Sequence, residues 1–84
     1  MDMFEKYFDN SERYRDLGCA IAYYRKRLGL TQEQLAEEVG ISRQHIGAIE
    51  APNMVRAFSL DVLFNIATIL EVEPYVLLKF SPDK

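Results

Sequence analysis

The sequence is poor in the residues on which metal and redox chemistry depend, with one cysteine, Cys19, and one histidine, His45, among 84 residues. A single cysteine excludes an intramolecular disulfide and a cysteine cluster for zinc. The chain also has no glycine-rich phosphate loop and no evident pair of catalytic carboxylates. We therefore expect a protein without enzymatic activity, metal or cofactor, in which Cys19 is a small residue of the core or its boundary.

Long apolar runs are absent as well: no stretch approaches the roughly 18 to 20 residues that a membrane span requires. The N-terminal sequence MDMFEKYFDN lacks the positively charged region of a signal peptide. These features predict a cytoplasmic protein without membrane contact. The length suits one domain, and we assign residues 1–10 to an aromatic extension, 11–80 to the domain and 81–84 to a frayed tail. No separate domain for a small-molecule effector is expected.

Positive charge is scarce, since 10 Lys and Arg residues stand against 13 Asp and Glu residues, for a net charge of −3. The acids gather towards both ends, whereas the middle of the chain, residues 23–56, is close to neutral or slightly basic. Attraction to a nucleic acid scales with the number of phosphates that the protein neutralises. One copy should therefore bind nucleic acid weakly by charge alone, and tight binding would need a second copy or good direct contacts.

Apolar residues recur at intervals of three and four along most of the chain, which predicts amphipathic helices and no strand pair. A long first helix is expected to begin at the potential caps in residues 9–11 and to end at Gly29. Within it, the small residues Gly18 and Ala22 are expected to allow a neighbouring helix to approach closely. The basic residues 25–27 suit the negative end of the helix dipole. Lys26 and Arg27 are either solvated there or in contact with phosphate.

Residues 30–50, LTQEQLAEEVGISRQHIGAIE, predict two short helices joined by a tight turn. Thr31 is expected to cap the first helix, with Gln34 reciprocating in a capping box. Gly40 supplies the left-handed backbone that ends this helix sharply, and Ser42 caps the second helix. A helix-turn-helix unit whose second helix presents polar side chains outward suits a reader of the DNA major groove.

The outer face of this second helix has side chains that can read base edges. Arg43 has the fork geometry for the two acceptors of guanine, and Gln44 can bracket the donor and acceptor of adenine. Ala48 offers a methyl group to the methyl of thymine. Gly47 lowers helix propensity by about 1 kcal/mol relative to alanine. It is either an exposed position with little constraint on its residue type or a position that lets the helix lie close to DNA, and we favour the second interpretation. His45, at the side of this face, is either solvated or in contact with a phosphate.

Two further helices complete the predicted fold. One follows Ser59 and is apolar over more than half of its circumference, so we expect it to be the central buried helix. A last short helix opens at Glu73-Pro74, because proline suits the first helical position. Four hydrophobic staples, each joining the residue before a cap to the fourth residue of the helix, set the entry angles of the chain. These pairs are Leu30 with Leu35, Ile41 with Ile46, Phe58 with Leu63, and Val72 with Leu77.

Residues from about 17 to 80 resemble the helix-turn-helix domain of phage repressors and their bacterial xenobiotic-response-element relatives, the Cro/C1-type family. The residues that carry the resemblance are Tyr24-Arg25-Lys26, Gly29 to Ala36, Val39 to Arg43, Ile46, Ile49-Glu50, Leu63, Ile66-Ala67 and Leu70. The resemblance implies a compact all-α, lambda-repressor-like fold of five helices, with the Arg43–Ala51 helix in the major groove. It also implies a partly buried, structural ion pair between Arg25 and Glu50. The apolar spacing of residues 3–8 allows a sixth short helix at the N-terminus.

Phosphate contacts are expected around the reading helix. The residues are Gln32, for which the resemblance implies this role, and Ser42, His45, Asn53 and Arg56. The chain departs from the family pattern in the loop that carries the last two. Pro52 stands where the family usually has glycine, the loop looks longer than usual, and Phe58 stands where proline is common. Contacts from that loop therefore depend on a conformation that the family pattern does not define.

Together these observations favour a sequence-specific DNA-binding transcriptional regulator, most simply a repressor that occludes polymerase. Because only two side chains are strong readers, one copy specifies few base pairs, and we expect a homodimer on an inverted repeat of double-stranded DNA. The alternative is an antitoxin-like or other protein-interaction module on the same fold, with DNA binding secondary or lost and a protein as partner. The acidic ends and the aromatic N-terminus favour that alternative. Residues 1–10 either pack on the domain, join a dimer contact or are disordered.

Overall fold

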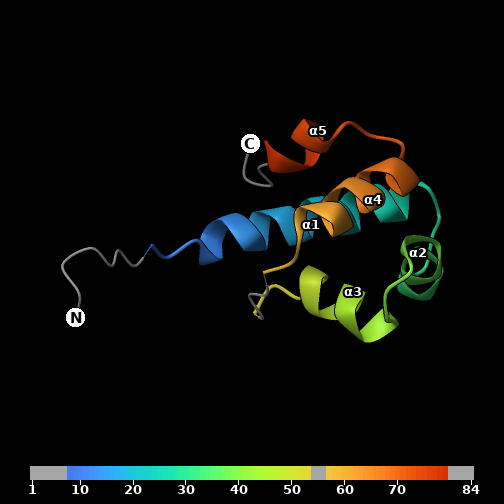
Figure 1. Ribbon diagram of the computed structural model, residues 1–84, viewed down its shortest axis with the longest axis horizontal. Coiled ribbons are helices and arrows are strands. Elements are labelled where there is room, and N and C mark those ends of the chain that lie inside the picture. Colours follow the sequence, from blue (N-terminus) through green and yellow to red (C-terminus); the bar gives the residue numbers. More distant parts are fainter. Residues whose placement is uncertain (1–7, 54–56, 80–84) are drawn as a thin grey trace.

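The computed structural model describes residues 8–53 and 57–79 of the chain. In these ranges it contains five helices and no strand (Figure 1). They are α1 (Ser11–Arg27), α2 (Gln32–Val39), α3 (Arg43–Glu50), α4 (Leu60–Leu70) and α5 (Pro74–Leu78). The predicted all-α, five-helix fold is confirmed. The sixth helix allowed within residues 3–8 falls almost wholly outside the described residues.

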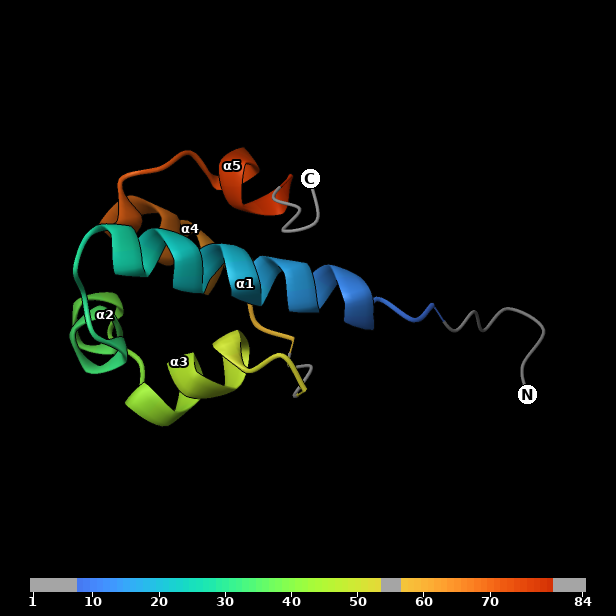
Figure 2. The ribbon, with the colours of Figure 1, turned by 180° about the vertical axis from the view of Figure 1, so that it is seen from behind.

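The helices form three tiers, which are stacked vertically in Figure 1. In Figures 1 and 2, α1 and α4 lie in the middle, with α5 on one side and the α2–α3 pair on the other. The long helix α1 packs against α3, α4 and α5, and α2 packs against α3 and α4. No helix in the described ranges is long and apolar enough to cross a membrane.

Side-chain caps begin three of the helices where the sequence predicted them. The Thr31 hydroxyl accepts from the Gln34 backbone N–H at 3.0 Å, and the Gln34 side chain accepts from the Thr31 N–H at 2.8 Å, which completes the capping box. The Ser42 hydroxyl accepts from the His45 N–H at 3.0 Å, and Ser59 caps α4 in the same way. Each cap satisfies a backbone donor that the first turn of a helix leaves unpaired.

The start of α1 is held by a different side chain. Asn10 occupies the cap position without a side-chain cap bond, and Asp9 accepts from the Ser11 backbone N–H at 3.0 Å instead. Hydrogen bonding from the Ser11 side chain and from its backbone N–H holds the pKa of the Asp9 carboxyl below its ordinary value.

The staple pairs divide between the core and its edge. The inner members are fully or almost fully buried, and the outer members are half-buried. The inner members are Leu35, Ile46, Leu63 and Leu77, and the outer members are Leu30, Ile41, Phe58 and Val72. Since each pair brackets a cap, the staples support the same helix starts that the caps fix.

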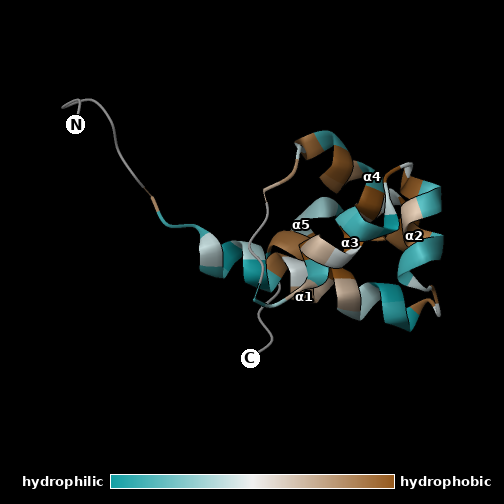
Figure 3. Cartoon of the chain, turned by 90° about the horizontal axis from the view of Figure 1, so that it is seen from below, coloured by the Kyte–Doolittle hydropathy of each residue, from teal (hydrophilic) through white to brown (hydrophobic). Residues whose placement is uncertain are grey.

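The helix after Ser59 was expected to be the central buried helix, because it is apolar over more than half of its circumference. This expectation holds for only part of α4, since the apolar side chains of Leu60 and Phe64 are 67% and 47% exposed. One face of α4, including Leu63 and Ile66, packs into the core against α1, α2 and α5. Figure 3 shows hydrophobic residues along α4. A domain with a single small core leaves part of such a helix in solvent.

Gly18 brings two backbones together. A Cβ at this position would overlap the carbonyl oxygen of Ile49. Only glycine therefore allows α1 to lie directly against the last turn of α3, and the close approach expected at Gly18 is confirmed. This contact fixes the C-terminal end of α3 on the helical body.

Candidate nucleic-acid interface

The helix α3 presents its polar side chains on the face turned away from the core. Ile46, Ile49 and Glu50 are buried, whereas Arg43 and Gln44 are exposed. His45, Gly47 and Ala48 are half-buried beside them. The helix ends at Glu50, with Ala51 as an extended cap, one residue earlier than the Arg43–Ala51 span that the sequence predicted.

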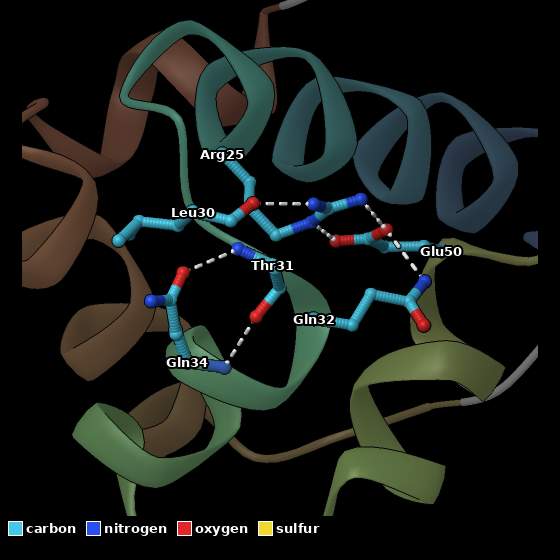
Figure 4. A network of polar contacts seen from close by, with 6 residues as sticks. All are labelled: Arg25, Leu30, Thr31, Gln32, Gln34 and Glu50. Atoms are coloured by element: carbon cyan, nitrogen blue, oxygen red, sulfur yellow. Dashed lines mark hydrogen bonds and ion pairs between the residues drawn. The ribbon is translucent and has the colours of Figure 1, made fainter.

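The last residue of α3 belongs to a buried polar network. Arg25 donates from Nε to Glu50 Oε2 at 2.8 Å and from a terminal nitrogen to Oε1 at 3.0 Å (Figure 4). Its other terminal nitrogen donates to the Leu30 carbonyl at 2.6 Å. The fork of a guanidinium matches both oxygens of a carboxylate, which makes such pairs strong and directional. The network therefore connects the end of α1, the loop before α2 and the end of α3.

Gln32 extends the same network from the start of α2. Its side-chain nitrogen donates to Glu50 Oε1 at 2.9 Å. Its amide oxygen lies beside Gly47, where an added Cβ would sit 3.6 Å away. A primary amide has two N–H donors, so the bond to Glu50 orients Gln32 and leaves one donor for a ligand. The structure thus places this predicted phosphate ligand at the junction of α2 and α3.

The other predicted phosphate ligands lie in different surroundings. The Ser42 hydroxyl accepts the cap bond described above and keeps its own hydrogen as a donor. His45 is half-buried in the first turn of α3. Asn53 is exposed in the turn that follows α3, and Arg56 lies outside the described residues.

Arg15 has a role that the sequence analysis missed. Its Nε donates to the Pro52 carbonyl at 2.9 Å and ties the loop after α3 to the first half of α1. The departure from the family pattern at Pro52 indicated an unusual loop, but no sequence signal identified Arg15 as its partner. Contacts between residues so far apart in the chain depend on the packing of α1 against α3.

The exposed cations of this region are few. Arg25 is buried and neutralised by Glu50, so it offers no charge to a ligand. Arg43 is exposed on α3, and Lys26 and Arg27 are exposed at the end of α1. Within the described ranges, no group of His, Cys, Asp and Glu side chains could hold a metal ion. The exposed Arg43 and Gln44 side chains can form hydrogen bonds with a polar ligand.

Comparison with known proteins identifies similar chains. A family model described as helix-turn-helix matches residues 21–77. A curated relative, an uncharacterized HTH-type transcriptional regulator of Methanothermobacter thermautotrophicus, is 51% identical over 41 residues, which are 44% of this chain. The match spans 59% of that relative's length.

Two solved structures share the fold at higher coverage. The restriction-modification controller protein C.AhdI from Aeromonas hydrophila superposes with a TM-score of 0.70 at 33% identity, over 76% of this chain and 94% of that protein. SinR, a master regulator for biofilm formation solved in complex with DNA, superposes with a TM-score of 0.69 at 30% identity. The alignment with SinR covers 75% of this chain and 98% of that one.

Proposed function

Because the chain belongs to the helix-turn-helix family, we propose that it is a sequence-specific DNA-binding transcriptional regulator that places α3 in the major groove. The observation that carries this proposal is the fixation of α3 at both ends. Ser42 caps its first turn, and the Arg25–Glu50–Gln32 network holds its last residue. A helix fixed in this way keeps Arg43 and Gln44 outward in a constant orientation, which base readout requires.

The proposed roles follow from the chemistry of each side chain. Arg43 donates to the O6 and N7 acceptors of guanine, and Gln44 pairs with the N6 and N7 of adenine. Ala48 contacts the methyl group of thymine, and Gly47 lets the helix backbone approach the groove closely. These four positions form the reading face.

Phosphates position this face without specifying sequence. Gln32 donates its second N–H to one phosphate, and Ser42 and His45 contact the strand beside the first turn of α3. Asn53 and Arg56 are proposed ligands on the loop that follows α3. A cationic donor near a phosphate adds affinity that falls as salt rises, because it displaces counterions from the DNA.

The regulator acts as a homodimer in this proposal. One copy has two strong base readers and a net charge of −3, so a second copy is needed for both affinity and specificity. An inverted repeat with half-sites about one helical turn apart suits two such copies. Occupancy of a promoter would then exclude polymerase, and the site of action is the cytoplasm. The family is one of regulators, and we propose no catalytic activity.

Selection of bound sequences from a random pool of DNA tests this proposal. The purified chain is expected to enrich an inverted repeat, and an Arg43→Ala, Gln44→Ala double variant, changed at exposed positions only, should enrich none. Affinity for the selected site should fall linearly on logarithmic axes as salt is raised. Failure to enrich any sequence, together with binding that does not respond to salt, would remove the DNA-reading role and favour the protein-interaction module.

A further inference from the structure

The guanidinium of Arg15, an exposed residue of α1, is held by the loop that follows α3. Its Nε donates to the Pro52 carbonyl at 2.9 Å. Among the described residues, no hydrogen bond or ion pair engages its two terminal nitrogens. Since a guanidinium carries its N–H donors in a rigid fork, the edge formed by these two nitrogens is available to a ligand.

The acidic side chains near Arg15 in the sequence leave its charge unpaired. Neither Asp9 nor Glu12 forms an ion pair with it in the described part of the chain, where Arg25–Glu50 is the single pair. The pKa of Asp9 is lowered mainly by hydrogen bonding from Ser11, and the Arg15 charge contributes least to this shift. An exposed guanidinium of this kind is a suitable donor for a phosphate.

The position of Arg15 follows from the packing of α1 on α3. Arg15 precedes Gly18 by three residues, so the two share one face of α1. At Gly18 this face meets the backbone of Ile49, in the last turn of α3. Figures 1 and 2 show α1 continuing beyond the end of α3. Arg15 therefore lies beside the segment by which the chain leaves the reading helix.

The C-terminal end of α3 has no positive charge of its own. A helix carries partial negative charge at this end, and α3 has no basic residue in its last turn. The carboxylate of Glu50 is neutralised by Arg25, which leaves no excess of positive charge. Arg15, bonded to Pro52 two residues beyond α3, supplies the cation that a phosphate at this end would need.

We propose that Arg15 is a further phosphate ligand of the interface, and this rests on the proposed function. Its terminal nitrogens donate to a phosphodiester of the DNA strand that passes the loop after α3. Asn53, the residue after Pro52, is the proposed ligand on the same loop. The Pro52 carbonyl orients the guanidinium, and its free edge matches two phosphate oxygens. The interface thus extends from the helix-turn-helix unit to the first half of α1.

The first measurement is the affinity of the full chain for its selected DNA site at several salt concentrations. Arg15→Ala should weaken binding by roughly two- to fivefold, the range of an exposed ion pair, and should do so for cognate and scrambled duplexes alike. The slope of log affinity against log salt should become shallower by about 0.9 for each copy bound. Urea denaturation checks that each variant is folded.

Arg13→Ala is the matched control. It removes the same charge from the same helix, but Arg13 lies about 200° around α1 from Arg15 and lines a groove with residues of α4 and α5. Its salt slope should equal that of the wild-type chain. An unchanged slope in Arg15→Ala, or an equal change in both variants, overturns the proposal.

The second measurement locates the phosphate. Duplexes that carry one neutral methylphosphonate linkage at a time are bound to the wild-type chain and to Arg15→Ala. At one linkage of each half-site, the neutral group should weaken the wild-type chain and leave Arg15→Ala unaffected, because both changes remove the same contact. This coupling should persist when Asn53→Ala is added to both proteins. Coupling at no linkage, or coupling that disappears with Asn53→Ala, overturns the proposal, since Arg15 would then act only by holding the loop.

The outcome separates from that of the proposed function. A chain that selects a DNA site without these effects keeps its reading role and loses only the Arg15 contact. A wild-type chain that selects no DNA sequence overturns the proposed function and the Arg15 contact together.

Discussion

Gln32 donates to Glu50 across 2.9 Å, so that the first residue of α2 and the last residue of α3 are hydrogen-bonded to each other. Glu50 is at the same time paired with Arg25 from the end of α1. The orientation of the reading helix is therefore set at a three-way junction of the helix-turn-helix unit. Gln32 is thus both a member of this junction and the residue proposed to contact a phosphate.

Replacing Gln32 with Ala should have two effects. A hydrogen bond to a charged acceptor contributes about 1.5–3 kcal/mol to the free energy of unfolding. Because Gln32 is half-buried, the loss in the variant should lie at or below the lower end of this range. DNA binding should weaken evenly across sequences, because a phosphate contact carries no base information. Urea denaturation and binding to cognate and scrambled duplexes measure these effects. Gln34→Ala is the control on the same helix: it removes half of the capping box but should leave DNA affinity intact. A change of base preference in the Gln32 variant would contradict the assignment.

The Arg25–Glu50 pair should behave as a buried structural pair. Arg25→Met leaves the Glu50 carboxylate buried without its partner, which should cost about 3–5 kcal/mol of unfolding free energy. The double variant Arg25→Met, Glu50→Leu should recover most of this loss, since an apolar replacement of both partners is often neutral or stabilising. Denaturation by urea gives all three values. Equal losses in the single and double variants would show that the pair contributes packing rather than charge compensation.

Local signals in the sequence were sufficient to predict where the helices begin. The capping box of Thr31 and Gln34 and the caps at Ser42 and Ser59 join residues three apart, so the spacing alone identifies them. The staples gave the correct inward residues for the same reason. The ends of α1 and α2 were predictable from glycines, and Gly29 and Gly40 indeed have left-handed backbone.

Long-range relationships were not accessible in this way. Arg25 and Glu50 are 25 residues apart, and only the family resemblance suggested that they pair. The bond from Gln32 to Glu50 and the bond from Arg15 to Pro52 depend on how packed helices face one another. The exposure of Leu60 was mispredicted because periodicity gives the apolar face of a helix but not how much of it the neighbours cover. The base and phosphate contacts stay predictions.

The two interior glycines should respond in opposite ways to alanine. At Gly47 a Cβ meets only the Gln32 side-chain oxygen, in ordinary contact, so Gly47→Ala should raise stability by up to about 1 kcal/mol through helix propensity. At Gly18 the Cβ meets the backbone of Ile49, so Gly18→Ala should cost about 1–3 kcal/mol. Thermal denaturation shows whether each variant is more or less stable than the wild-type chain. A DNA affinity that falls in the stabilised Gly47 variant would support close approach of α3 to the groove, and an unchanged affinity would argue against it.

Glu71 ends α4 with a strained backbone. Its φ of 63° is left-handed, a region that costs a residue with a Cβ about 1–2 kcal/mol. The carboxylate also lies at the negative end of the α4 dipole. Glu71→Gly should therefore stabilise the domain by roughly 0.5–1 kcal/mol. Glu37→Gly, at an exposed position inside α2, is the matched control and should destabilise by about the same amount. If both variants lowered the free energy of unfolding, another contact of Glu71 would offset the strain of its backbone.

Arg43 should determine one base pair of the operator. Arg43→Ala is expected to lower affinity for the selected site by about 1–3 kcal/mol and to relax preference at that position only, because bidentate contact with guanine is lost. The exposed position of Arg43 predicts little change in stability. Binding assays with DNA duplexes that carry each of the four base pairs in turn at every position of the site measure the effect. Arg27→Ala is the control, since it removes an exposed cation at the end of α1 and should weaken all sequences alike or none. If site preference survives in the Arg43 variant, the face of α3 that meets DNA has been assigned incorrectly, and the fixation of this helix by Gln32 and Glu50 serves another surface.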